Sequence, residues 1–536
     1  MKRSFRLLLS VFSGILLSLA WLGFPGWTLF VALLPLLLLD KYFVENKSSF
    51  RSVSFWGHAF LAFLIWNVST TWWIAHATVI GAVMAILVNS FLMSLVWWLA
   101  HTARRNFRAG LGYLALVVFW ISFEFFHFHW DIEWPWLTLG NGFANNVKMI
   151  QWYQFTGALG GTLWILIMNI LIFHIIKNIL QKSPPGNLVY NLFWFVLFLI
   201  IPLWYSFHTY NSYKEKNNPQ NIVIVQPNID PYSESYDLKA EQQKLRKFMQ
   251  LAESKAGDST DFIIGPETVF ENPGYWNEAE IKRNSFVRQL RMMLQKYTHA
   301  QLVFGVSSFK IYPDEMHASP TARKQGDLYY DRFNTAIYMD NTGDYQIYHK
   351  SKLVVGVEKM PFVKYLGFIN DIVINIGGTT GSLGRQKESS NFVADDSTKV
   401  APVICYESIF GEYVASYVKK GAQLIFIITN DGWWKNTPGY KQHMSFARLR
   451  AIETRRSIAR SANTGISCFI NQRGDVFQAT GWWVDTAIQQ SLNANNKLTF
   501  YVKYGDYIAR ISLFVSVLLV LFLVSNYFQK DTKKPH

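Results

Sequence analysis

Cysteine and charged residues are both scarce in this chain of 536 residues. The only two cysteines, Cys405 and Cys468, exclude a disulfide framework and a four-cysteine zinc site. Charged residues make up 16% of the sequence, against roughly 25% in soluble proteins, whereas hydrophobic residues make up 50%. This balance excludes a disordered, collagen-like or disulfide-rich secreted protein, and it indicates that part of the chain lies in a membrane.

Basic residues outnumber acidic residues by 51 to 36, which gives a formal net charge of +15. Such a surplus can indicate nucleic-acid binding. Here, however, the basic residues alternate with long apolar runs, which is how membrane proteins set their orientation. We therefore expect membrane lipid as a partner, and no nucleic acid.

Eight apolar stretches are each close to the roughly 20 residues that cross a bilayer as a helix. They are Leu7–Phe24, Trp27–Phe43, Phe55–His76, Val79–Leu99, Leu111–His129, Ala158–Ile179, Leu188–Tyr210 and Tyr507–Phe528. Only Pro25 and Gly26 separate the first two, so one re-entrant hairpin is the alternative to two spans. The first stretch begins like a signal peptide, but no clear small-residue cleavage site ends it, and we expect a retained helix.

The charges between these stretches predict the orientation of the chain. One set of connections carries Lys2, Arg3, Arg6, Lys41, Lys47, Arg51, Arg104, Arg105, Arg108, Lys177, Lys182, Lys530, Lys533 and Lys534, whereas the short connections on the other side carry only Lys148. This asymmetry predicts that both termini are cytoplasmic. The expected organisation is a transmembrane bundle of about seven helices over residues 1–210, an extracytoplasmic domain over 219–505 and a last helix over 507–528.

Two polar features interrupt the membrane part. Glu124 lies inside the fifth stretch, where a carboxyl group either handles a substrate or proton or joins two helices by a hydrogen bond, which is the interpretation we favour. An alternating run of possible metal ligands follows: His127, His129, Asp131 and Glu133. Spacing alone does not make ligands converge, so an interfacial turn closed by Trp134–Trp136 is favoured, and we expect no metal site and no cofactor.

From about Pro219 to Gly505 the sequence changes to short β-branched runs that alternate with helical stretches, which predicts a layered α/β domain. The predicted strands are Ile222–Gln226, Phe262–Gly265, Leu302–Val306, Thr335–Tyr338, Val403–Cys405, Leu424–Ile428 and Ser467–Ile470. The predicted helices are Lys239–Leu251, Ile281–Tyr297 and Phe410–Lys419.

Chemically active side chains follow three predicted strand ends. Glu267 comes after an apolar strand and an abrupt Gly-Pro turn, Lys350 follows a hydrophobic hairpin arm, and Cys405 lies where a strand enters a helix. The partial positive charge of a helix N-terminus favours a thiolate at such a junction. A carboxylate could take the thiol proton, and a lysine could stabilise negative charge on an attacked carbonyl oxygen.

Each of these residues also has an ordinary structural interpretation. A single cysteine in a strand is more often an inert core residue, which suits Cys468 in its apolar run but not Cys405, which ends its strand. Glu267 alone could cap a helix, and Lys350 alone could be a solvated surface lysine. The combination of Glu267, Lys350 and Cys405, and their order along the chain, favour a catalytic site.

The three together resemble the Glu–Lys–Cys set of the nitrilase superfamily. The resemblance extends to Thr429–Trp434 (TNDGWW), Gln442-His443, Ala447–Glu453 (ARLRAIE) and Ala462–Ser467 (ANTGIS). Together with the membrane spans, Trp134–Gly140 (WPWLTLG) and Val225–Ile229 (VQPNI), the whole chain is similar to the apolipoprotein N-acyltransferase family. This resemblance implies a multi-pass α-helical membrane bundle joined to a nitrilase-like α-β-β-α sandwich.

The resemblance also implies roles for individual residues. Glu267 would be the general base, Lys350 the oxyanion stabiliser and Cys405 the nucleophile. The supporting and substrate-binding set would be Glu358, which supports base and lysine, Tyr406 and Glu407, which shape the acyl pocket, and Trp136, Tyr236, Trp433 and Trp434. Tyr236 stands near a position where the family has tryptophan, and Val354–Glu358 lacks the family's proline and phenylalanine.

The implied reaction passes an acyl chain from the sn-1 position of a phospholipid to Cys405 and then to the amine of a diacylglyceryl-cysteine apolipoprotein. The implied location is the bacterial inner membrane with a periplasmic catalytic domain, and we expect a monomer. Trp433, Trp434, Met360 and Phe362 are candidates either for loops at the lipid interface or for core packing.

Three alternatives remain at this point. A membrane-anchored nitrilase-like amidohydrolase would use the same residues with water as acceptor. A transporter with an external binding domain would need paired polar residues in several spans and repeats, of which the sequence has one acid and no repeat. A glycosyl or polyprenyl transferase would need acidic metal-binding pairs, for which only Asp131 and Glu133 offer support.

Overall fold

The structure, a computed structural model, describes residues 1–232, 238–270, 274–362 and 382–531. The chain divides into two compact units. The first, here called the membrane unit, contains Met1–Ala75, Val79–Ser212 and Tyr504–His536. The second, here called the catalytic unit, contains His76–Thr78 and Tyr213–Lys503.

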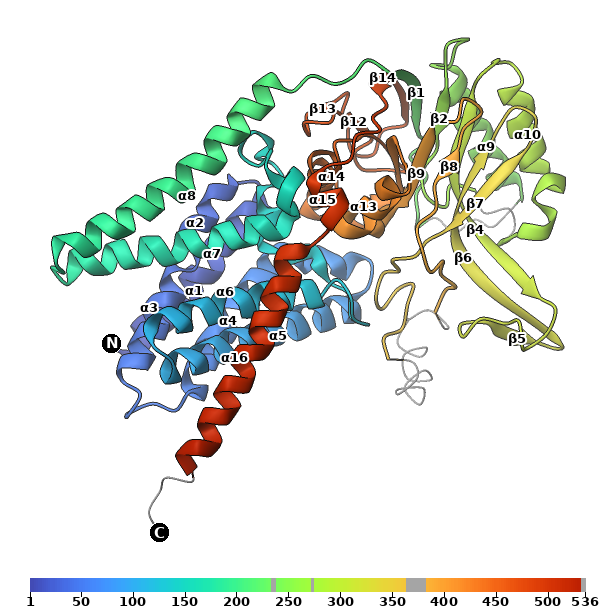
Figure 1. Cartoon of the computed structure of the whole chain (residues 1–536). Coiled ribbons are helices and arrows are strands. Elements are labelled where there is room, and N and C mark those ends of the chain that lie inside the picture. The colour runs from blue at the N-terminus through green and yellow to red at the C-terminus, as the bar shows by residue number, and fades with distance from the viewer. Residues whose placement is uncertain (233–237, 271–273, 363–381, 532–536) are drawn as a thin grey trace. The chain divides into compact units, whose positions relative to one another are not determined.

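The membrane unit is a bundle of helices (Figure 1). Its α-helices are α1 (Arg3–Leu19), α2 (Leu29–Ala32), α3 (Leu34–Glu45), α4 (Val53–Thr71), α5 (Val79–Asn106), α6 (Ala109–Phe126), α7 (Tyr153–Leu180), α8 (Pro185–Ser212) and α16 (Tyr507–Asp531). In the described part of the chain, six helical segments are long and apolar enough to cross a membrane: Arg3–Leu22, Gly26–Glu45, Val79–Asn106, Tyr153–Leu180, Pro185–Ser212 and Tyr507–Asn526.

Two of the eight expected spans fall short of this criterion, although both are helices. The apolar part of α6 is only Gly110–Phe126. Helix α4 carries polar side chains such as His58 and Asn67, which lower its mean hydropathy. The membrane bundle is therefore confirmed with six candidate spans by length and composition.

Glu124 joins three segments of the membrane unit. Its Oε1 accepts hydrogen bonds from the indole N–H of Trp120 at 2.9 Å and from the backbone N–H of Leu139 at 2.8 Å. Its Oε2 accepts one from the Thr162 hydroxyl at 2.6 Å. The carboxyl group thus ties α6 to the turn around Leu139 and to α7, which agrees with the interpretation of Glu124 as a link between helices.

The catalytic unit contains two β-sheets among its described residues. One has the order β14 (Thr486–Asn493), β1 (Pro219–Gln226), β2 (Phe262–Ile264), β4 (Gln301–Tyr312), β6 (Leu328–Met339), β5 (Arg323–Gln325), with β3 (Trp276–Asn277) paired to β4 and β7 (Tyr345–His349) to β6. The other has the order β13 (Val476–Phe477), β12 (Cys468–Ile470), β11 (Ser457–Ala462), β10 (Leu424–Thr429), β9 (Lys399–Ile404), β8 (Phe392–Val393).

Helices cover both outer faces of this pair of sheets. Figure 1 shows α9 (Leu238–Glu253) and α10 (Ser285–Leu294) on one side, and α13 (Gly411–Lys419), α14 (Pro438–Thr454) and α15 (Phe500–Tyr504) on the other. Between the sheets lies an apolar core in which the rings of Phe262 and Phe426 meet edge to face at 5.1 Å. The resulting order of layers is the expected α-β-β-α sandwich.

Parallel pairing determines where the active residues meet. Strand β1 runs parallel to β2 and β2 to β4, while β9, β10 and β11 are also mutually parallel. Because the carboxyl ends of parallel strands lie at one edge of a sheet, the residues that follow β9 and β10 are brought to neighbouring positions. Glu267, which follows β2 in the facing sheet, reaches the same place, since its carboxylate accepts from the backbone N–H of Asn430 at 3.0 Å.

Candidate active site

Glu267 follows β2 on a tightly packed turn. The next residue, Thr268, has a left-handed φ of 45°. The neighbouring strand β4 approaches so closely that a Cβ atom on Gly305 would lie 2.7 Å from the Cα of Glu267 and 2.7 Å from the backbone nitrogen of Thr268. Only glycine fits at position 305, and this close approach fixes the direction of the carboxylate.

Lys350 lies between two carboxylates directly after β7. Its Nζ donates to Glu267 Oε1 at 3.0 Å and to Glu358 Oε1 at 2.8 Å, and its side chain is 1% exposed. The amide of Asn334, on β6, donates to the same two oxygens at 2.7 and 3.0 Å. A third donor for each carboxylate is a backbone N–H, from Asn430 to Glu267 and from Val354 to Glu358.

Cys405 follows β9 at a strained backbone position. Its φ of 48° lies in the left-handed region, which costs a non-glycine residue roughly 1–2 kcal/mol. It begins a 3-10 turn, Cys405–Ile409, and helix α13 starts only at Gly411. The thiol is buried close enough to Glu267 and Lys350 for both charges to act on its pKa.

The electrostatics of the site differ from the expected resting thiolate. Burial and the Glu267 carboxylate raise the pKa of Cys405 well above its usual value, and the nearby lysine offsets only part of this. Burial opposes the charge on Lys350, but Glu267 and Glu358 outweigh it and raise the pKa of the lysine well above its usual value. Two carboxylates share one cation here, so the thiol keeps its proton until a base removes it.

Glu407, which is predicted to shape the acyl pocket, lies in a buried hydrogen-bond network beside the nucleophile. Its carboxylate is fully buried and accepts hydrogen bonds from the Tyr348 hydroxyl at 2.6 Å, from Ser351 N at 2.7 Å and from Ile404 N at 2.8 Å. Burial raises the pKa of Glu407 to about 7, against the effect of these donors. Glu407 therefore holds the segment after Lys350 against the segment before the nucleophile.

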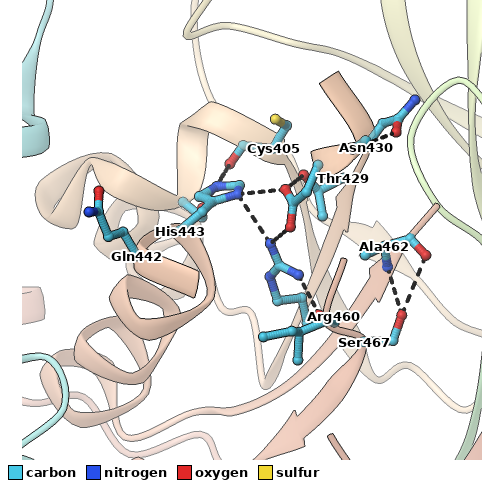
Figure 2. A network of polar contacts seen from close by, with 12 residues as sticks. Cys405, Thr429, Asn430, Gln442, His443, Arg460, Ala462 and Ser467 are labelled. Atoms are coloured by element: carbon cyan, nitrogen blue, oxygen red, sulfur yellow. Dashed lines mark hydrogen bonds and ion pairs between the residues drawn. The ribbon is translucent and has the colours of Figure 1, made fainter. Parts of the chain in front are cut away.

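A second polar network lies behind the main chain of Cys405 (Figure 2). Asp431 accepts from Arg460 Nη2 at 2.7 Å and from Thr429 Oγ1 at 3.0 Å, and its Oδ1 lies 2.9 Å from His443 Nδ1. Burial opposes the charge of Asp431, but Arg460 and His443 lower its pKa to about 2. The side chains of Asp431, His443 and Arg460 have no exposed surface.

The remaining predicted residues lie in different surroundings. Tyr406 is buried and packs edge to face on Phe410 at 5.3 Å. Trp434 packs against the His443 ring at 5.4 Å, whereas Trp433 is 43% exposed and its backbone oxygen accepts a hydrogen bond from Tyr232.

Two further predicted residues are not among the described residues of the catalytic unit, and their roles stay predictions. Trp136 belongs to the membrane unit, where it is buried against Trp73 with ring centroids 4.8 Å apart. Tyr236 lies outside the described residues.

Sequence reasoning assigned no role to Asn334 or to the residues behind Cys405. Asn334 directly precedes the predicted strand Thr335–Tyr338, and its residue type gives no signal of a role. Asp431 and His443 belong to quoted motifs, but nothing in the sequence shows that Arg460, 29 positions after Asp431, pairs with it. Cys468 is buried in β12, as expected for a core cysteine.

Comparisons with known proteins match both units of the chain. The family model described as carbon-nitrogen hydrolase matches residues 221–496, and the model described as apolipoprotein N-acyltransferase N-terminal domain matches residues 13–171. Proteins named apolipoprotein N-acyltransferase are similar over nearly the whole chain. The one from Chlorobaculum tepidum is 28% identical, over 96% of this chain and 95% of its own length, and the one from Thermotoga maritima is 25% identical, over 96% and 93%.

Among solved structures, Nit3 of Saccharomyces cerevisiae, a member of branch 10 of the nitrilase superfamily, matches 52% of this chain and 92% of its own. That match has 16% identity and a TM-score of 0.36. The chain belongs to the carbon–nitrogen hydrolase family, and its resemblance to apolipoprotein N-acyltransferases is confirmed along nearly its whole length.

Proposed function

We propose that this protein is an apolipoprotein N-acyltransferase. It transfers an acyl chain from the sn-1 position of a phospholipid to the α-amine of a diacylglyceryl-cysteine at the N-terminus of an apolipoprotein. The observation that carries the chemistry is a buried thiol beside Lys350, whose ammonium is shared by Glu267 and Glu358. The names of the relatives that match nearly the whole chain support N-acylation of an apolipoprotein, and the phospholipid donor is part of the proposal.

In the first half-reaction the Cys405 sulfur attacks the ester carbonyl carbon while Glu267 accepts the thiol proton. The electron pair of the carbonyl moves onto its oxygen, and the Lys350 ammonium and the backbone N–H of Tyr406 stabilise the resulting oxyanion. When this intermediate collapses, the bond to the glycerol oxygen breaks. That oxygen takes the proton from Glu267, so that lysophospholipid leaves and a thioester remains.

In the second half-reaction the neutral α-amine of the acceptor attacks the thioester carbonyl carbon. Glu267 accepts a proton from the attacking nitrogen, the carbon–sulfur bond breaks, and the proton returns to the sulfur. The product is an amide-linked third acyl chain, and the enzyme is back in its starting state. The same oxyanion stabilisers serve both steps because both pass through a tetrahedral intermediate.

The burial of the site supports transfer to an amine over hydrolysis. Lys350 is 1% exposed, Glu267 6% and Cys405 7%. A buried thioester has little access to water, so a substrate that carries its own amine into the site has the advantage. A raised thiol pKa fits this scheme, because Cys405 becomes a nucleophile only when a bound substrate allows the proton to pass to Glu267.

We further propose the placement of the protein in the cell. It is a multi-pass protein of the bacterial inner membrane with both termini in the cytoplasm and a periplasmic catalytic unit, and it acts as a monomer. The basic residues that flank one side of the spans support this orientation. The domain limits proposed are residues 1–210, 219–505 and 507–528.

The test uses purified protein in detergent, a phospholipid with a labelled sn-1 chain, and a diacylglyceryl-cysteine peptide. Mass spectrometry is expected to show one labelled acyl chain on the peptide amine and an equal amount of lysophospholipid. The matched control is a peptide whose α-amine is acetylated, which is expected to gain nothing. Free labelled fatty acid in place of acylated peptide would instead indicate the hydrolase.

A further inference from the structure

We infer that His443 is a positioning residue that aims the oxyanion-binding N–H of Tyr406 by holding the carbonyl oxygen of Cys405. This inference rests on the proposed acyl transfer through Cys405. It concerns residues that the mechanism above leaves unused, namely His443 and its buried neighbours.

The carbonyl oxygen of Cys405 is held from two sides. His443 Nε2 lies 3.2 Å from it, and the Ser408 hydroxyl donates to it at 2.7 Å. His443 Nε2 also lies 3.0 Å from Ser408 Oγ. The Ser408 hydroxyl donates to the carbonyl, so both of these neighbours present acceptor oxygens to Nε2, and the Arg460 guanidinium, which can only donate, lies beside Nδ1. We therefore assign the ring proton to Nε2, which donates to the carbonyl.

The other side of the imidazole ring is fixed by charges. His443 Nδ1 lies 2.9 Å from Asp431 Oδ1 and 3.1 Å from Arg460 Nη2, and Figure 2 shows His443 and Arg460 side by side. Trp434 packs against the imidazole ring, with ring centroids 5.4 Å apart. Arg460 is itself anchored by donating to the carbonyl of Ile466. The ring therefore has one orientation, with Nε2 directed at the main chain of the nucleophile.

Holding this carbonyl has a direct consequence for the oxyanion. The carbonyl of Cys405 and the N–H of Tyr406 belong to one planar trans peptide unit and point in opposite directions. Fixing the oxygen on the His443 side fixes the N–H on the opposite side. Two hydrogen bonds to the carbonyl also polarise the peptide and strengthen its N–H as a donor.

The strain at Cys405 explains why such a support is needed. Its left-handed φ of 48° is less stable than the ordinary conformations, so an unsupported peptide would relax by rotation. Rotation of this peptide would turn the Tyr406 N–H away from the reacting oxygen. His443 and Ser408 thus stabilise the strained conformation that the reaction uses.

The test separates oxyanion stabilisation from the reactivity of the thiol. Acylation of Cys405 by a p-nitrophenyl fatty ester passes through an oxyanion, whereas alkylation of the same thiol by iodoacetamide does not. His443→Leu is expected to lower the acylation rate by about 100-fold, the effect of losing one oxyanion donor, while alkylation changes less than about threefold. His443→Gln, which keeps an N–H donor, is expected to recover at least about tenfold of the loss.

A milder pair of variants guards against misfolding. Ser408→Ala removes one donor to the carbonyl and is expected to slow acylation about fivefold with unchanged alkylation. The matched control is Ser461→Ala, because Ser461 is also buried and its hydroxyl donates to a backbone carbonyl, that of Val225, at 2.9 Å. This control variant is expected to leave the rates of acylation and alkylation unchanged.

Three results would overturn the inference: unchanged acylation in His443→Leu and Ser408→Ala, an equal loss of acylation and alkylation, or no advantage of His443→Gln over His443→Leu. Failure of the proposed function is recognised separately in the wild type. If the wild type forms an acyl-Cys405 with the ester but no N-acylated peptide from phospholipid, the proposed donor or acceptor is wrong, and the comparison of variants still decides on His443. A wild type that forms no acyl-Cys405 contradicts both.

Discussion

Replacing Lys350 by Met removes a cation that Glu267 and Glu358 share. The lysine nitrogen lies 3.0 and 2.8 Å from their carboxylate oxygens and is almost fully buried. Removing one partner from a buried ion pair typically costs about 3–5 kcal/mol, because the remaining charge is left without compensation. Lys350→Met is therefore expected to lose about that much unfolding free energy at pH 8, and about 1,000-fold or more in the rate of acyl-Cys405 formation.

The penalty is expected to depend on pH. In the variant, two adjacent buried carboxylates favour uptake of a proton, so the pKa of one of them in the folded state rises above its unfolded value of about 4.3. A group whose pKa is higher in the folded state than in the unfolded state stabilises the fold fully at pH values below its unfolded pKa. This stabilisation is lost as the pH rises through the pKa of the folded state. The destabilisation of Lys350→Met is thus smaller at pH 5 than at pH 8.

Urea titration with pulse proteolysis of the catalytic unit measures this free energy at both pH values. The matched control is Lys420→Met, since Lys420 forms an exposed ion pair with Glu388 at 2.9 Å, for which about 0–1 kcal/mol is expected. A loss below about 1 kcal/mol in Lys350→Met at pH 8, or a penalty that shrinks as the pH rises, would refute the shared-cation arrangement.

Three further predictions follow from packing and burial. Gly305→Ala places a methyl group 2.7 Å from the Glu267 Cα, so it is expected to lose about 1–3 kcal/mol and most acyl transfer. The control Gly257→Ala, where an added Cβ atom has no neighbour within 4 Å, is expected to keep both stability and acyl transfer. Equal behaviour of Gly305→Ala and Gly257→Ala would contradict the close approach of Gly305 to Glu267. Burial raises the folded pKa of Glu407 to about 7. The stability of the wild type relative to Glu407→Gln is therefore expected to be greatest below about pH 4.3 and to decline as the pH rises through 7. If urea titrations showed that this difference in stability grows with pH, the raised pKa would be contradicted. Glu124→Gln is expected to keep the melting temperature and the turnover of the wild type. Glu124→Leu leaves three hydrogen-bond donors without their acceptor and is expected to lower the melting temperature. Loss of turnover in Glu124→Gln at an unchanged melting temperature would instead indicate that Glu124 handles a proton.

Much of the catalytic unit was predictable because its central strands are apolar throughout. Leu424–Thr429 and Phe262–Ile264 are fully buried, as their sequences indicate. Strand β11, Ser457–Ala462, was not predicted, since half of its residues are polar. It is nevertheless completely buried, because Asp431 compensates the charge of Arg460 and backbone carbonyls accept from its serines.

Local capping explains the errors in helix limits. The expected helix Ile281–Tyr297 is divided at Asn284, whose side chain accepts from Phe286 N at 2.8 Å and so begins α10 at Ser285. The expected helix Phe410–Lys419 begins one residue later, at Gly411, and Cys405 precedes it in a 3-10 turn. The pKa of the thiol is raised by burial and Glu267, and not lowered by a helix terminus. The Asn284 cap is local, whereas the effect of Glu267 on the thiol joins residues far apart in the sequence, so spacing could not reveal it.

The most direct test of the account is the covalent state of Cys405 after incubation with a phospholipid that carries a labelled sn-1 chain, without acceptor. Peptide mapping is expected to find one labelled acyl group on Cys405, removable by hydroxylamine, lost on addition of a diacylglyceryl-cysteine peptide and not formed as a thioester in Cys405→Ser. Label on Cys468, label that no amine removes, or thioester formation that persists without the Cys405 sulfur would contradict the account.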